Sequence, residues 1–131
     1  MKNYTLTITP ENEEHLVYCK SVDQNPWLGD PCPGVRYRFR FPNRYEASVI
    51  KFFGSYGWED DLWELGLCKS LCDDHYMIYN RDFPDVKGFL TDEEVNECLD
   101  RIRGYDDIST GEWWLSSADA FDEIMKEEEN D

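Results

Sequence analysis

Five cysteines and two histidines are the residues that could form a metal site or a nucleophile. Cys68, Cys72 and His75 form one Cys/His cluster, and His15 with Cys19 could complete a tetrahedral zinc set. Zinc sites usually pair their cysteines at tighter spacing, however, and this cluster lies in an apolar stretch. A catalytic thiolate needs a neighbouring base, and neither histidine stands in a recognisable catalytic motif. We therefore expect reduced, partly buried cysteines, no metal and no enzymatic activity.

Charged residues offer two further kinds of chemistry. The acidic runs at 59–61 and 73–74 lack the ligand spacing of a calcium-binding loop, so we interpret them as solvated turn charges. Arg36, Arg38, Arg40 and Arg44 form a basic ladder on one sheet face, which could contact phosphates. A protein with a net charge of −16 would repel a polyanion over much of its surface. We expect the ladder to pair instead with acids of a helix packed on that face, and we expect no cofactor.

The negative charge is concentrated in the second half of the chain. Residues 1–66 hold ten acids and seven bases, which leaves 19 acids and six bases, a net of −13, for residues 67–131. Aromatic residues make up 15% of the sequence, which distinguishes it from an acidic disordered chain. The acids therefore belong to segments that fold. A basic partner would relieve their mutual repulsion, and solubility alone is the simpler alternative.

Two helices are predicted in this acidic half. Thr91 and Glu94 form a capping box at the start of a helix over 90–104, with Leu90 and Val95 as a hydrophobic staple. A second helix is predicted over 117–128. Its apolar positions Phe121, Ile124 and Met125 are expected to face inward.

The elements before residue 90 are predicted from hydrophobic periodicity. Alternation predicts strands over 4–9, 35–41, 62–67 and 75–79, with a hairpin connection over 69–74. Helical spacing predicts helices over 11–22 and 43–53, the latter with Asn43 as N-cap and Gly54 at its end. Prolines and glycines predict a loop over 25–34. These elements indicate an α+β fold, a small, mostly antiparallel sheet of three to four strands with three to four helices packed mainly on one face. We expect a single globular domain over 1–126 and an acidic tail over 127–131.

Carboxylates on the two C-terminal helices could imitate nucleic acid. Duplex phosphates recur about every 3.4 Å along each strand, and acids at i, i+3 and i+4 of a helix lie about 5–6 Å apart. Two acidic helices could therefore present a double row of charge, with Tyr105, Trp113 or Trp114 as anchors. The predicted partner-binding residues are Asp92, Glu93, Glu97, Asp100, Asp106, Asp107, Glu112, Asp119, Asp122, Glu123 and Glu127.

Three segments carry a resemblance to a group of proteins. The stretches 53–57 (Phe-Gly-Ser-Tyr-Gly), 62–65 (Leu-Trp-Glu-Leu) and 85–95 resemble small uncharacterised proteins of Firmicutes phages and mobile elements. The motif is structural: a glycine turn, a strand and a capped helix. Small acidic phage proteins are often anti-CRISPR or anti-restriction inhibitors, and several imitate DNA, so the resemblance implies such a role by analogy.

These observations lead to one expected function and two alternatives. We expect a non-enzymatic inhibitor that binds the basic nucleic-acid channel of a host defence nuclease, such as a CRISPR effector, and that binds neither nucleic acid nor a membrane. No signal peptide or membrane-length apolar run is evident, so we expect the cytoplasm of the host bacterial cell. One alternative is a small protein-binding adaptor whose acidic surface serves solubility. The other is a Cys/His metal-dependent protein.

Overall fold

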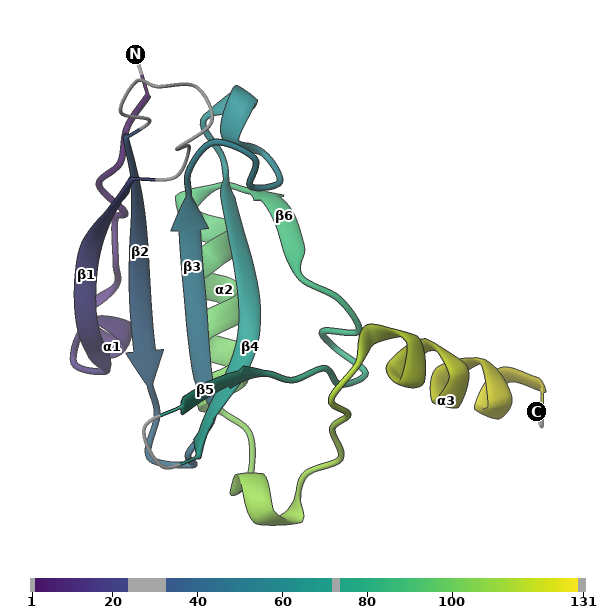
Figure 1. Ribbon diagram of the computed structural model, residues 1–131. Coiled ribbons are helices and arrows are strands. Elements are labelled where there is room, and N and C mark those ends of the chain that lie inside the picture. Colours follow the sequence, from purple (N-terminus) through teal and green to yellow (C-terminus); the bar gives the residue numbers. More distant parts are fainter. Residues whose placement is uncertain (1, 24–32, 72–73, 130–131) are drawn as a thin grey trace.

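A computed structural model describes residues 2–23, 33–71 and 74–129. Strands dominate up to residue 90, and the two longer helices follow them (Figure 1). The helices and strands, in chain order, are α1 (Pro10–Glu13), β1 (Leu16–Asp23), β2 (Pro33–Arg40), β3 (Glu46–Lys51), η1 (Trp58–Asp60, a short 3-10 helix), β4 (Trp63–Leu71), β5 (Asp74–Met77), β6 (Lys87–Leu90), α2 (Asp92–Arg103), η2 (Ile108–Thr110) and α3 (Ser117–Glu129).

The six strands form one antiparallel sheet in the order β1-β2-β3-β4-β5, with β6 also paired to β4. The first part of β4 pairs with β6 and its last part, from Cys68 onward, pairs with β5. This arrangement confirms the α+β class and the antiparallel sheet, but the sheet is larger than the three to four strands predicted. The predicted loop falls mostly on residues 24–32, outside the described residues. Cys72 and Asp73, between β4 and β5, also lie outside the described residues.

Two predicted helices are wrong, because β1 and β3 occupy their places. Asn43 is not an N-cap: its side-chain amide donates to the carbonyl oxygens of Ile102 (2.8 Å) and Tyr105 (3.1 Å), beyond the end of α2. Arg44 adopts a positive φ of 72° in the turn that leads into β3. β3 then lies between β2 and β4 with nearly every residue buried. The other predicted helix is reduced to α1, and its remaining residues form the edge strand β1.

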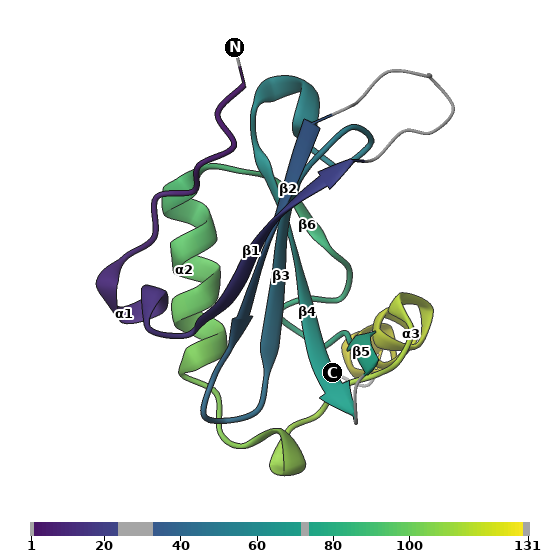
Figure 2. The ribbon, with the colours of Figure 1, turned by 60° about the vertical axis from the view of Figure 1, so that its left-hand side comes forward.

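The N-terminal segment 4–9 is not a strand, because α2 rather than another strand binds its backbone. Asn96 accepts from the amide of Thr9 (3.0 Å) and donates to the carbonyl of Thr7 (2.8 Å). Asp92 accepts from the amide of Thr7 (2.9 Å). Figure 2 shows the segment running along α2. The alternating threonines therefore cover the helix and do not extend the sheet.

The core lies between α2 and one face of the sheet (Figure 2). The predicted capping box is present, since Thr91 accepts from the amide of Glu94 and Glu94 accepts from the amide of Thr91. The inward stripe of α2, with Val95 and Leu99 fully buried, packs with the apolar face of β2, β3 and β4. Burying a leucine of this kind contributes about 2–5 kcal/mol relative to alanine.

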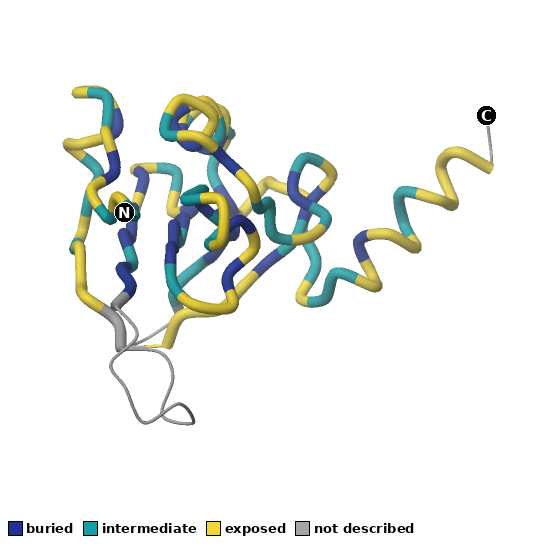
Figure 3. The backbone as a smooth tube through the Cα atoms, turned by 90° about the horizontal axis from the view of Figure 1, so that it is seen from above, coloured by how far each residue is buried: buried dark blue, intermediate teal, exposed yellow. Residues whose placement is uncertain are grey.

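The helices do not share one face of the sheet as predicted. Only α2 lies across the sheet; α1 packs beside α2, and α3 extends away from the body (Figures 1 and 3). The predicted inward residues Phe121 and Met125 of α3 are exposed, and Ala120 is the buried one. α3 also continues to Glu129, so residues 127–129 of the predicted acidic tail are helical. Among the described residues, none of the helices is long and apolar enough to cross a membrane.

Candidate protein-binding surface

The predicted double row of carboxylates does not form. α2 and α3 lie on different sides of the sheet in Figure 2 and run in different directions in Figure 1. The eleven acids therefore make no single patch. They divide into residues that hold the fold together and residues that face solvent without a partner.

Asp92 and Asp100 on α2 belong to the first group. Asp92 accepts a 2.7 Å hydrogen bond from the indole Nε1 of Trp63, which is fully buried, as well as the bond from the amide of Thr7. Asp100 accepts from the buried Asn12 amide (3.0 Å) and pairs with Arg103 (3.2 Å). Both carboxylates fix the N-terminal segment and α1 to α2, so both have a structural role.

Asp107 also has a structural role. It caps η2 by accepting from the amide (3.0 Å) and the hydroxyl (2.6 Å) of Ser109, and it also accepts from the guanidinium of Arg44 (3.1 Å from Nε). These hydrogen bonds hold the pKa of Asp107 below its usual value, and the bond from Arg44 has the largest effect. The carboxylate therefore stays ionised and ties the β2–β3 turn to the C-terminal half.

Arg81 connects two more of the predicted acids. Its guanidinium binds Glu112 (2.8 Å) and Glu127 (2.7 Å), which joins α3 to the segment before it. Asp106 and Glu112 line a hollow beside Arg81. Glu123 pairs with Lys126 within α3 (3.3 Å). Six of the eleven predicted acids are thus engaged by side chains or amides of the protein itself.

The other five acids are Glu93, Glu97, Asp106, Asp119 and Asp122, and none makes an ion pair among the described residues. All five are exposed. Glu93 and Glu97 lie on the outer side of α2, whereas Asp119 and Asp122 lie on α3. The free carboxylates that can act together with other exposed groups are those of α3.

α3 is held at its start and again at Glu127, through Arg81, and it is exposed along most of its length. Ser116 caps it by accepting from the amide of Asp119 (3.1 Å), and the hydroxyl of Ser117 donates to the Pro84 carbonyl (2.6 Å). Beyond this anchor, Phe121 is 45% and Met125 57% exposed. Figure 3 shows the helix leaving the body as a mostly exposed rod. A fixed start with a free face is the geometry of a helix that binds another protein.

The apolar residues on this helix form a surface that the sequence reasoning missed. Phe121 and Met125 lie one turn apart, and Leu115, just before the helix, is 67% exposed. The segment 117–129 holds six acids and one base, so the apolar side chains stand among carboxylates. We call Leu115 and the exposed residues of α3 the α3 surface. The sequence signal for this surface is the helical spacing of Phe121 and Met125, but that spacing predicts burial.

The arginine ladder pairs with an acid of a neighbouring strand, not with a helix as predicted. Glu46 of β3 is buried and binds Arg38 (3.1 Å) and Arg40 (3.4 Å). Burial by itself raises the pKa of Glu46, but hydrogen bonds from Ser70 and Arg38 and the two guanidinium charges outweigh it and lower the pKa. The Nε of Arg36 is buried without an acceptor in the described part of the chain. Arg38 and Arg40 therefore balance a buried carboxylate.

The described members of the candidate metal cluster do not come together as a site. Cys68 is buried, and burial raises the pKa of its thiol to about 11. His75 bonds the Ser70 hydroxyl (2.9 Å), while His15 packs on Phe41. No group of three or more metal-binding side chains gathers within residues 2–23, 33–71 and 74–129. The remaining cysteine of the cluster lies outside these ranges.

Comparison with known proteins gives no relative for this chain: no family model matches it, and neither the curated proteins nor the solved structures give a significant match. The similarity to phage and mobile-element proteins therefore stays a sequence-based hypothesis. The candidate site has to be judged on its own geometry, in which the α3 surface is the distinctive feature.

Proposed function

We propose that the protein is a non-catalytic inhibitor that binds the basic nucleic-acid channel of another protein through the α3 surface. The observation that carries the proposal is the exposure of Leu115, Phe121 and Met125 on a segment that also carries the unpaired carboxylates of Asp119 and Asp122. Large apolar side chains grouped on a projecting helix mark an interface. The surrounding net negative charge selects a basic partner and speeds its association.

The class of partner follows from charge and resemblance. A nucleic-acid channel is basic, and a protein of net charge −16 is attracted to it over a long range. The resemblance to phage and mobile-element proteins suggests a host defence nuclease, such as a CRISPR effector or a restriction enzyme. The acids of α2 face another side of the sheet, so we assign the contact to α3 and not to both helices.

A bait comparison tests this proposal. The variant Asp119→Asn/Asp122→Asn/Glu128→Gln removes three charges from α3. The control Glu11→Gln/Glu13→Gln/Glu14→Gln removes three exposed charges at α1. A lysate that contains CRISPR and restriction nucleases is passed over each protein, and bound proteins are identified by mass spectrometry. We expect the wild type and the control to retain a nuclease that the α3 variant loses. Equal retention by both variants, or retention of no nucleic-acid-binding protein, would contradict the proposal.

The adaptor alternative draws on the same apolar residues. If Leu115, Phe121 and Met125 bind an apolar groove without electrostatic help, Phe121→Ser/Met125→Ser should abolish binding while the charge variant leaves it intact. Added salt would then change the affinity little, because burial of apolar surface is not screened. Salt dependence therefore separates the two functions.

A further inference from the structure

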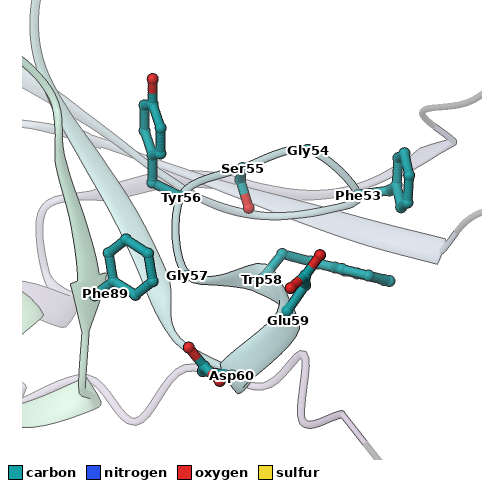
Figure 4. A pocket seen from close by; sticks show the side chains of 9 residues that line it. All are labelled: Phe53, Gly54, Ser55, Tyr56, Gly57, Trp58, Glu59, Asp60 and Phe89. Carbon is teal, nitrogen blue, oxygen red and sulfur yellow. The ribbon is translucent and has the colours of Figure 1, made fainter.

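A second candidate site lies at the loop between β3 and β4. The segment 53–60 and Phe89 of β6 enclose a hollow of about 250 Å³ (Figure 4). Phe53, Tyr56 and Phe89 around it are 42%, 60% and 56% exposed. Single exposed rings are ordinary on a protein surface, but three around one hollow mark an interaction site. None of these residues belongs to the α3 surface.

The backbone holds the hollow in a fixed shape. The amide of Phe89 donates to the carbonyl of Tyr56 (3.2 Å), which joins β6 to the loop. The approach is close enough that a Cβ on Gly88 would lie 2.2 Å from the Cβ of Tyr56. Gly57 has a φ of 99°, and Phe89 itself has a φ of 58°, which is rare for an aromatic residue. The loop that carries Tyr56 is therefore closely packed against β6, which carries Phe89.

Two carboxylates complete the hollow. Glu59 and Asp60 are exposed, line it, and form no ion pair with the described residues. Figure 4 shows both carboxylates on the side of Gly57 away from Tyr56. The third acid of this run, Asp61, binds Lys51 (2.9 Å), so it is not the solvated charge that the sequence predicts. The hollow thus combines apolar rings with two carboxylates that have no cationic partner among the described residues.

The same end of the protein already pairs cations with aromatic rings. The ammonium of Lys2 lies 4.1 Å from the ring centre of Trp58 and donates to the Trp58 carbonyl (2.6 Å). Lys51 lies 4.2 Å from the ring centre of Trp63 while it binds Asp61. Lys2 also donates to the carbonyl of Glu59 (3.2 Å), so two residues that line the hollow already hold a cation on one side. Among the described residues, no cation lies on the rings of Phe53, Tyr56 and Phe89.

We propose that this hollow binds an arginine side chain presented by a partner protein. A guanidinium can stack on an aromatic face while its edge donates two hydrogen bonds to carboxylates, which a lysine ammonium does not match. The volume is just below the roughly 300–1,000 Å³ of sites for whole small molecules, and it fits one side chain. The inference goes beyond the proposed function, because it needs neither α3 nor a nucleic-acid-binding partner.

Amide spectra of isotopically labelled protein test the assignment with short peptides. The probe is a capped Gly-Arg-Gly peptide, compared with its citrulline and lysine counterparts. We expect the arginine peptide to shift the amides of Gly54, Gly57 and Phe89 and to bind about tenfold more tightly than either counterpart. Equal binding of the citrulline peptide would overturn the role of charge. Equal binding of the lysine peptide would overturn the choice of arginine.

Two variants and a matched control locate the site. Phe89→Gly removes one ring at a position whose positive φ glycine adopts freely, so the fold is retained. Glu59→Gln/Asp60→Asn removes the charges, and Glu13→Gln/Glu14→Gln makes the same charge change at α1. We expect each site variant to weaken arginine binding about tenfold and the control to leave it unchanged. Equal weakening by the control would overturn the site. The α3 charge variant should bind the peptide normally even if it loses its nuclease.

Discussion

Replacing Asp92 with alanine should destabilise the protein by several times as much as replacing its neighbour Glu93. The carboxylate of Asp92 accepts from the Nε1 of Trp63 at 2.7 Å, and Trp63 has no exposed surface. Asp92→Ala would leave this indole N–H buried without an acceptor, at a cost of about 1–3 kcal/mol. It would also remove a negative charge from the first turn of α2, which is worth about 0.3–1 kcal/mol.

The expected total is therefore about 2–4 kcal/mol of unfolding free energy, with the lost bond to the Thr7 amide included. Glu93→Ala removes an exposed side chain without a partner from the same first turn, so only the charge effect applies and we expect a cost of about 0.3–1 kcal/mol. Urea unfolding at neutral pH, followed by tryptophan fluorescence and by circular dichroism, measures both values.

A double-mutant cycle isolates the bond between the two side chains. Trp63→Phe removes the donor, and Trp63→Phe/Asp92→Ala should be more stable than the sum of the single changes by at least about 1 kcal/mol. Additive effects, or equal effects of the Asp92 and Glu93 changes, would refute the division of the acids into structural and free residues.

Three further predictions concern the arginine clamp, the buried carboxylate and the thiols. Arg81→Ala should cost less than about 1 kcal/mol because its pairs are exposed, but it should speed amide exchange in α3. Lys126→Ala is the control, and equal exchange in the two variants would contradict the clamp. Because the pKa of Glu46 is lowered from 4.5, its stabilising contribution is complete above that pH and is lost as the pH falls through the lowered value. Glu46→Gln should therefore cost about 3 kcal/mol at neutral pH and progressively less below pH 4.5, and a gap independent of pH would show that the pairing is absent. In native protein a thiol reagent mapped by mass spectrometry should label Cys19, which is exposed, and should spare Cys68 until unfolding; equal labelling rates would contradict the burial.

Local signals predicted the elements whose partners are close in sequence. The Thr91/Glu94 box defines the start of α2, because both hydrogen bonds form within one turn. The alternation of apolar residues and arginines in β2 was sufficient to place one face in the core. In both cases the residues that decide the structure lie within the element itself.

The predicted elements are wrong where residues distant in the sequence determine the local structure. Asn43 is a residue type that is typical of an N-cap, but its side-chain amide donates to the carbonyl of Ile102, 59 positions away. The sequence around β3 gives no sign that β2 and β4 will enclose it. For the same reason the sequence could not separate Asp92 from Glu93. Their side chains are alike, and only the fold places Trp63 beside one of them.

The orientation of α3 shows the same limit for the candidate site. Phe121 and Met125 have the spacing of a core-facing stripe, which most often indicates burial. In the structure the body contacts the start of the helix at Ser117, and the stripe stays exposed. The composition predicted an acidic surface, but the apolar residues among the acids became evident only when their exposure was known.

Displacement of nucleic acid from a captured nuclease is a direct test of the proposal that the protein binds the nucleic-acid channel. A fluorescent duplex is bound to the nuclease, and the protein is added at several salt concentrations. We expect that the wild type displaces the duplex, that its affinity falls steeply as salt rises, and that Asp119→Asn/Asp122→Asn/Glu128→Gln weakens displacement about tenfold. Glu11→Gln/Glu13→Gln/Glu14→Gln should displace like the wild type. Binding of the nuclease without displacement, or displacement that is insensitive to both salt and the α3 charges, would contradict the proposed function.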